Sequence, residues 1–139
     1  MDETIRRVLT ETTTWAVVGC SPSPHRDSHR IAALLQRRGF RVVPVNPAAD
    51  VLLGERAYPS LADVRDAGVD VDVVDVFRRA DQAGAHVDEA IALGAKAVWL
   101  QLGVIDEAAA RRAEQAGLLV VMDRCPKIEY PLLSGRRSG

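Results

Sequence analysis

The amino-acid sequence predicts an α/β fold: a doubly wound, mainly parallel sheet of about five strands with helices on both faces. Short apolar runs without polar alternation, such as residues 15–19 (WAVVG), recur along the chain and are typical of strands buried on both faces of a parallel sheet. Segments with apolar residues at helical spacing separate these runs. Glycines follow several of these segments, where helix C-termini favour them. This alternation implies right-handed crossovers within one sheet.

The first half of the chain alternates helix and strand, over residues 2–12, 15–19, 28–38 and 41–45. Ile5 and Val8 share one face of the first predicted helix. Gly39 follows the second helix, as expected of a C-terminal cap residue. Pro44 has no N–H for a strand ladder, so it indicates the end of the second strand or an edge position. Residues 46–59 are rich in turn formers, and we expect a loop there.

The second half continues this alternation, with helices over residues 60–68, 81–93 and 106–117 and strands over residues 71–77, 96–100 and 118–122. Ser60 and Asp63 resemble a capping box at the start of the first of these helices. Asp106 opens the last helix, where an acidic side chain suits the helix dipole. We therefore expect a single Rossmann-like domain over residues 1–133. The polar, glycine-rich residues 134–139 are expected to form a disordered tail.

Composition and charge limit the classes of partner. The 139 residues are 47% apolar and 27% charged, which is ordinary for a globular domain, and the formal net charge is −1. This balance gives no support for nucleic acid or an anionic membrane as a partner. No apolar run is long enough to span a bilayer, and the charged N-terminal segment lacks the apolar core of a secretory signal. With only two cysteines, Cys20 and Cys125, the chain is expected in the reducing cytoplasm.

The segments that follow the predicted strands hold the candidate site residues, because ligands of open α/β sheets bind beyond the carboxyl ends of the strands. These segments are residues 19–22 (GCSP), 46–47 (NP), 77–79 (FRR), 101–103 (QLG) and 123–126 (DRCP). They supply backbone amides, hydroxyl groups, carboxamides and three arginines, but only one carboxylate, Asp123. That balance favours a phosphorylated ligand.

The segment WAVVGCSPSPHRDS (residues 15–28) has the strand, glycine, polar loop and helix start of a phosphate cradle. Gly19 allows close approach of the backbone, Ser21 offers a hydroxyl group and Arg26 offers a forked cation. Ser28 lies at the expected helix N-terminus, where free amides attract anions. The G-x-G-x-x-G dinucleotide fingerprint is absent, and a plain strand-to-helix connection with a Ser or Asp cap is the alternative.

The ends of the second and third predicted strands argue against NAD. Dinucleotide-binding folds place an acid after the second strand for the ribose, but Asn46 and Pro47 stand there, and this pair also forms turns. After the third strand, Phe77 beside arginines could flank a base and a phosphate; alternatively, Phe77 belongs to the core and one arginine is solvated. Arg78 is the favoured arginine. Asp75, within this strand, has no assigned chemical role.

Nucleophilic and metal chemistry find little support in the sequence. Cys125 lies near Arg124 and Lys127, whose positive charges would suit a reactive thiol, but no histidine is evidently paired with it. The three histidines are scattered along the chain. Neither a metal-type cluster nor a carboxylate pair stands out.

Several stretches carry a family resemblance over residues 3–133: AVVGCSPSPHRDSHRIA, GFRVVPVNP, LGERAYPSLADV, VDVVDVFRR, ALGAKAVWLQLGV and AGLLVVMDRCPKIEY. In this order they resemble the small stand-alone CoA-binding proteins, whose Rossmann-like domain is similar to the CoA-binding part of the succinyl-CoA synthetase alpha subunit. The resemblance implies that CoA lies across the strand ends. The residues that it assigns to the ligand site are Gly19, Cys20, Ser21, Arg26, Ser28, Asn46, Pro47, Phe77, Arg78, Gln101 and Gly103.

The function implied by the resemblance is binding of CoA or an acyl-CoA without catalysis of its own. The chain shows no phosphohistidine or nucleotide-grasp domain, so we do not expect a complete ligase. A cysteine-based redox or CoA mixed-disulfide protein and an NAD(P)-binding regulator are the alternatives. Asp27 stands where relatives often have proline, and it would either place negative charge near the phosphates or cap the helix. Tyr130 stands where relatives tend to have histidine. The acyl group, protein partner and oligomeric state stay open.

Overall fold

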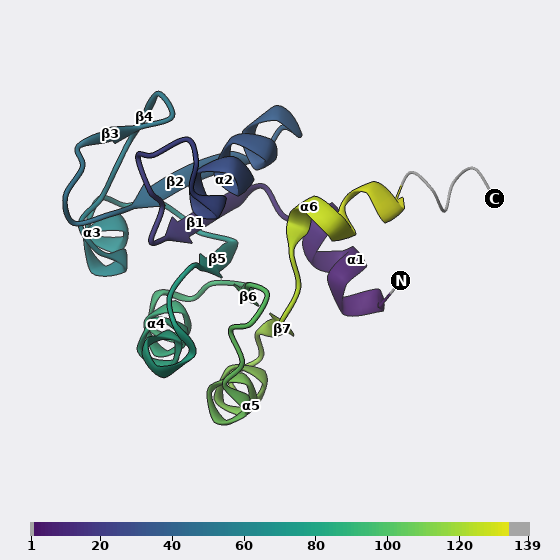
Figure 1. The fold of residues 1–139 in the computed structure, drawn as a ribbon. Helices are drawn as coiled ribbons and strands as arrows, with labels where there is room; N and C mark the ends of the chain where they lie inside the picture. The colour runs from purple at the N-terminus through teal and green to yellow at the C-terminus, as the bar shows by residue number, and fades with distance from the viewer. Residues whose placement is uncertain (1, 134–139) are drawn as a thin grey trace.

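The computed structural model describes residues 2–133, and within them it confirms the predicted fold class. One parallel sheet is formed by β1 (Thr14–Val18), β2 (Arg41–Val45), β5 (Val73–Val76), β6 (Ala97–Leu100) and β7 (Leu119–Val121). The order of the strands in this sheet is β2-β1-β5-β6-β7 (Figure 1). The predicted tail, residues 134–139, lies outside the described residues.

Helices cover both faces of the sheet. One face carries α1 (Glu3–Thr10), α2 (Asp27–Arg37) and α6 (Pro126–Glu129), and the other carries α3 (Leu61–Asp66), α4 (Ala80–Leu93) and α5 (Glu107–Gln115). The first face has an aromatic core, in which the centroid of the Trp15 ring lies 5.5 Å from that of Trp99 and 5.4 Å from that of Phe40. The second face is packed with small and branched side chains such as Val74 and Ala83. Both cores bury the sheet, which explains the continuous apolar runs of its strands.

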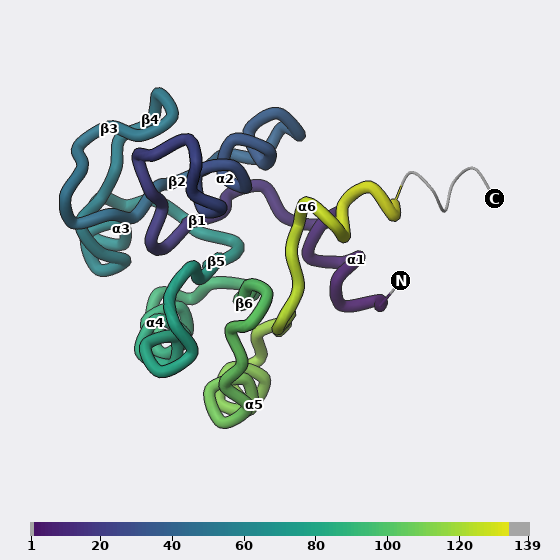
Figure 2. The backbone as a smooth tube through the Cα atoms, in the orientation of Figure 1, coloured from purple at the N-terminus to yellow at the C-terminus, as the bar shows by residue number. Residues whose placement is uncertain are grey.

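The strand order reverses next to β1. The chain leaves β1 through α2 to β2 on one side, and it then returns past β1 to pair β5 with its other side, a path that Figure 2 traces. The carboxyl ends of β1 and β5 are therefore neighbours, with Val18 opposite Val76. Such a reversal is where open α/β sheets form their ligand sites.

Two short parts of the structure were not predicted. Residues 46–59, expected to be a loop, contain an antiparallel hairpin of β3 (Val51–Leu52) and β4 (Glu55–Arg56). Two-residue strands are too short to show a period in the sequence. Helix α6 begins after Cys125 with a proline in its first turn, a position that suits proline because its missing N–H has no partner there in any case.

The helix starts agree with the sequence at two of three positions. The Asp63 amide donates to the Ser60 Oγ at 3.2 Å at the start of α3, and the Ala109 amide donates to the Asp106 Oδ1 at 3.0 Å at the start of α5. At α2, the suggestion that Asp27 caps the helix is wrong. Asp27 is the first helical residue, and the preceding arginine holds the cap position without a side-chain cap bond.

Candidate ligand-binding site

Gly19 leaves β1 at the switch point with a left-handed backbone, φ +84°. A Cβ atom there would lie 2.6 Å from the carbonyl oxygen of Phe77, at the end of β5, and 3.4 Å from the Nε of Arg78. Backbone oxygen atoms do not tolerate a carbon at 2.6 Å, so only glycine fits without a shift. The two loops therefore touch at Gly19, and the side chain of Arg78 lies beside the first loop.

The loop between β1 and α2 is held by its own serines. The Ser21 amide donates to the Ser28 Oγ at 2.9 Å, and the Ser23 amide donates to the Ser21 Oγ at 3.1 Å. The Nδ1 of His29 lies 3.0 Å from the Ser21 carbonyl oxygen. Ser28 is buried, so its hydroxyl group shapes the loop from beneath. These bonds hold the backbone of the loop in place.

Asn46 fastens the end of β2 to the same loop. Its Nδ2 donates to the Cys20 carbonyl oxygen at 2.8 Å, and its Oδ1 accepts from the Ala48 amide at 2.7 Å. The second bond is the turn expected of an Asn-Pro pair. Pro47 lies exposed within this turn. Because both polar ends of Asn46 bond to backbone, the residue braces the loop.

A pocket opens between this loop and the end of β5, with a volume of about 590 Å³. We call it the loop pocket; its lining residues are Gly19, Ser21, His25, Arg26, Asp27, Ser28 and Phe77. The Arg26 side chain is exposed and forms no ion pair within residues 2–133, so its guanidinium is available to an anion. The Asp27 Oδ1 lies 4.0 Å from the Arg30 Nη1, one turn along α2. Arg30 is therefore within ion-pair distance of this acid.

A second pocket of about 430 Å³ adjoins the first and shares Asp27 and Phe77 with it. We call it the α6 pocket, because α6 and the residue before it form one wall; its other lining residues are Arg30, Ile31, Gln101, Leu102, Val104, Cys125, Lys127 and Ile128. Leu102 and Ile128 are 56% and 54% exposed. A ligand with a phosphorylated end and an apolar end would match these two pockets.

A family model described as CoA binding domain matches residues 13–131. The chain belongs to this family. This CoA-binding domain is similar to the uncharacterized protein YneT of Bacillus subtilis, with 34% identity over 126 residues and 91% of each chain covered.

Two solved structures extend the family comparison. One is Prb, a protein redesigned for binding, with 40% identity, a TM-score of 0.88 and coverage of 97% of this chain and 93% of that chain. The other is a Thermus thermophilus protein, with 34% identity, a TM-score of 0.84 and coverage of 96% and 99%. The resemblance seen in the sequence is thereby confirmed at the level of family and fold.

Most predicted site residues of the CoA-binding domain lie at the two pockets. The loop pocket is lined by Gly19, Ser21, Arg26, Ser28 and Phe77, and the α6 pocket by Phe77 and Gln101. Arg78 lies against Gly19. The Gly103 amide, after β6, donates to the Asp123 Oδ1 at 2.8 Å. Direct contact of each with a ligand stays a prediction.

Five predicted residues do not line either pocket: Cys20, Asn46, Pro47, Arg78 and Gly103. Cys20 is completely buried under the loop. Burial, and to a smaller extent the nearby carboxyl of Asp75, raises the pKa of the Cys20 thiol to about 11. At neutral pH the Cys20 thiol is therefore protonated and shielded from solvent. Its backbone carbonyl oxygen takes part in the loop structure through the bond from Asn46.

Tyr130, where the family resemblance led us to expect histidine, lies away from both pockets. The Arg38 guanidinium sits 5.0 Å above its ring, and the Phe40 ring packs edge-on at 6.2 Å. The three residues line a separate pocket near the amino ends of β1 and β2, together with residues such as Thr13 and Gly39. The tyrosine thus serves packing at the end of the sheet opposite the candidate site.

Several lining residues of the α6 pocket were not assigned to the site from the sequence, among them Arg30, Lys127 and Ile128. Arg30 follows Arg26 by about one helical turn. This spacing indicates that Arg30 lies on the same side of the helix as Arg26, the residue predicted to bind phosphate. Lys127 and Ile128 belong to α6, which has four residues and left no periodic pattern to recognise.

A buried polar pair lies beside the α6 pocket. Asp75 of β5 is completely buried, and Gln101, which follows β6, is 6% exposed. The Gln101 Nε2 donates to the Asp75 Oδ1, whereas the Asp75 Oδ2 has no partner among the described residues. Burial raises the pKa of Asp75 to about 8, and the bond from Gln101 lowers it by less. At neutral pH this carboxyl is therefore largely protonated.

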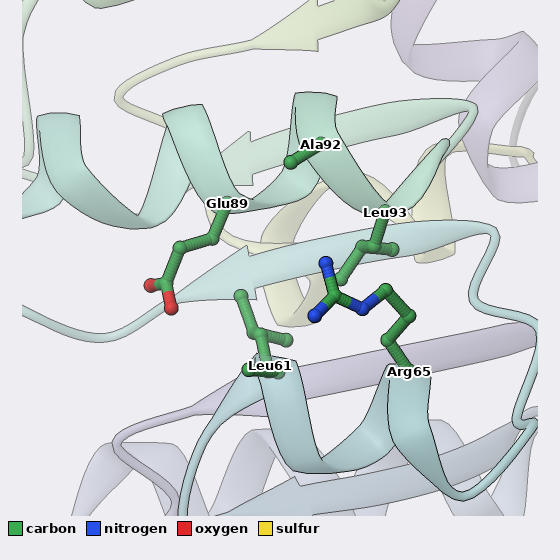
Figure 3. Close-up of a pocket in the computed structure, with 6 residues that line it drawn as sticks. Leu61, Arg65, Glu89, Ala92 and Leu93 are labelled. Carbon is green, nitrogen blue, oxygen red and sulfur yellow. The ribbon is translucent and has the colours of Figure 1, made fainter.

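A smaller pocket on the opposite face of the sheet lies between α3 and α4, with Leu61 and Arg65 from one helix facing Glu89 and Leu93 from the other (Figure 3). Its volume of about 60 Å³ is too small for a nucleotide. Within residues 2–133, no three His, Cys, Asp or Glu side chains gather as metal ligands. No helix in this part of the chain has the length and apolarity of a membrane span.

Proposed function

We propose that this protein binds CoA or an acyl-CoA across the carboxyl ends of its parallel strands. The observation that carries the proposal is the pair of adjoining pockets, one beside an arginine and a helix N-terminus, the other lined largely by apolar side chains. CoA has two matching parts, a phosphorylated adenosine and a pantetheine arm without charge. Membership of the CoA-binding family supports this class of ligand.

The loop pocket is the proposed site of the phosphates. The first amides of α2 have no partner within the helix, and the helix dipole makes this end attractive to anions. Arg26 stands at the cap position of α2, where its guanidinium can make two parallel hydrogen bonds to a phosphate. The Arg30 Nη1, 4.0 Å from the Asp27 Oδ1, offsets part of the negative charge that this acid brings to the helix start.

The α6 pocket is the proposed site of the pantetheine arm and any acyl group. Ile31, Val104 and Ile128 give it apolar walls. Covering the exposed side chains at its mouth would contribute roughly 25 cal/mol for each Å² of apolar surface removed from water.

We further propose that the protein acts by binding alone and resides in the cytoplasm. A thiol nucleophile needs a base within hydrogen-bond reach. Cys125 has no hydrogen bond to a histidine within residues 2–133, and the histidine that lines a pocket, His25, lines the other one. Both cysteines are free thiols, which suits a reducing compartment.

Thermal unfolding with candidate ligands tests the proposal. A ligand that binds only the native state stabilises it by about 2.7 kcal/mol at a concentration of a hundred times Kd. CoA and acetyl-CoA should raise the Tm, and NAD and NADP should not, because Asn46 stands where dinucleotide folds place an acid. Stabilisation by NAD alone would overturn the proposal. Native mass spectrometry of the protein as purified adds an independent check for a bound CoA mass.

A second candidate function is thiol–disulfide exchange at Cys125, favoured by its position in the wall of the α6 pocket. The Cys125 thiolate would attack the disulfide of oxidised CoA, form a bond to one CoA sulfur and release the other CoA as a thiolate. Non-reducing mass spectrometry after incubation with oxidised CoA should find one adduct. The adduct should persist in Cys20→Ser and vanish in Cys125→Ser. A wild-type chain without an adduct removes this candidate.

A further inference from the structure

The position of Asp75 is costly for the fold. Asp75 lies in the central strand β5, with Val17 opposite it on one neighbouring strand and Trp99 on the other. It is completely buried, and one of its two oxygens has no partner among the described residues. Transferring a carboxyl group into such surroundings costs free energy that a branched apolar residue would not. Costs of this kind are typical of positions that serve a site.

One end of the Gln101 amide bonds to Asp75 in the structure, which leaves the other end for the α6 pocket. The Gln101 Nε2 is committed to the Asp75 Oδ1, which accepts a hydrogen bond whether the carboxyl is protonated or ionised. Gln101 is only 6% exposed, and yet it lines the pocket. Its Oε1 has no hydrogen-bond partner within residues 2–133. The pocket therefore presents a buried, oriented acceptor among side chains such as Val104 and Ile31, apart from the exposed carboxylate of Asp27 that it shares with the loop pocket.

We propose that Gln101 is a specificity-determining residue for the pantetheine arm of CoA, accepting a hydrogen bond from one of its amide N–H groups at Oε1, and that Asp75 is its positioning residue. This inference rests on the proposed function. An acceptor in an apolar pocket favours an arm that brings a donor, because an arm without one leaves the acceptor desolvated and unpaired. The pocket is thus expected to discriminate against a plain alkyl chain of similar length.

Calorimetric titration with two probes tests this inference: CoA, and 3′-phosphoadenosine 5′-diphosphate, which lacks the pantetheine arm. Gln101→Leu and Asp75→Val should bind CoA roughly tenfold more weakly. Both should bind the arm-less nucleotide as the wild type does. Asp75→Asn keeps an acceptor oxygen for Gln101 and should stay within about threefold of wild-type affinity for CoA. Gln115→Leu, an exposed substitution on α5, is the matched control.

Unfolding by urea distinguishes positioning from a general structural role. Asp75→Val should raise the urea midpoint while it weakens CoA binding, whereas a residue that only supports the fold would lower both. Unchanged CoA affinity in Gln101→Leu overturns the inference, and so does an equal loss for both probes, which would place the adenine rather than the arm at Gln101. A wild-type protein that binds neither probe would overturn the proposed function and, with it, this inference.

Discussion

Replacing Gly19 by alanine tests whether the loops after β1 and β5 are held in contact as the structure shows. The substitution adds a Cβ atom 2.6 Å from the Phe77 carbonyl oxygen, on a backbone with φ +84°. Two costs result. A left-handed backbone with a Cβ costs roughly 1–2 kcal/mol, and forcing an extra atom into a packed contact typically costs a further 1–3 kcal/mol or so.

A matched control separates these two costs. Gly94 has φ +79° at the end of α4, and a Cβ atom there would meet nothing within 4 Å. Gly94→Ala should therefore lower the free energy of unfolding by the backbone cost alone, about 1–2 kcal/mol. Gly19→Ala should lower it by about 2–5 kcal/mol in total.

Equilibrium urea unfolding of the wild type and both variants measures the difference. If Gly19→Ala and Gly94→Ala are equally destabilised, the loops do not touch as described and the reasoning about the switch point fails. If Gly19→Ala is the less stable of the two, the contact between the loops is real. CoA affinity of the folded variant then shows how far the loop pocket depends on that contact.

Three further predictions concern the site and its support. Arg26→Ala should weaken CoA binding by roughly 1–3 kcal/mol in calorimetry, because a charged hydrogen bond is lost. Arg37→Ala, at the far end of α2, is the control and should bind CoA as the wild type does. Equal CoA affinities of the two variants would remove Arg26 from the site. Ser28→Ala should lower the free energy of unfolding by about 1–3 kcal/mol in urea, because it leaves the Ser21 amide without its partner; an unchanged midpoint would show that water replaces the hydroxyl group. The pKa of Asp75 is raised to about 8 from 3.8, so the native state holds a proton that the unfolded chain releases in this range. The contribution of Asp75 to the free energy of unfolding should therefore be fully present near pH 4 and fall toward pH 8, by at most about 1.4 kcal/mol per pH unit. Asp75→Asn should flatten this dependence; parallel pH curves for the two proteins would contradict it.

The strands and the strand ends were predictable because their signals are local. Residues 42–45 carry a continuous apolar run, and the rule that ligands bind at strand ends needs only the positions of the strands. Gly19 and Arg26 could therefore be selected from the sequence, and the structure places both at the loop pocket.

The remaining site features depend on which strands are neighbours. Asp75 and Gln101 are 26 residues apart and meet because β5 pairs with β6, which no local pattern reveals. The exact partners of Asn46 likewise depend on the return of the loop after β1 to the end of β2. Helix α6 escaped prediction because one short turn leaves no hydrophobic period, although its residues form a wall of the second pocket.

The contribution of α6 to the α6 pocket has a consequence for the order of folding. The walls of that pocket come from α2 near one end of the chain and from Lys127 and Ile128 near the other. A domain generally folds as a unit, so the α6 pocket is complete only after the residues through α6 have been made. Under the proposed function, a chain whose α6 has not docked would leave the arm of a ligand in water. Tight binding of the whole ligand therefore reports that the last helix has docked.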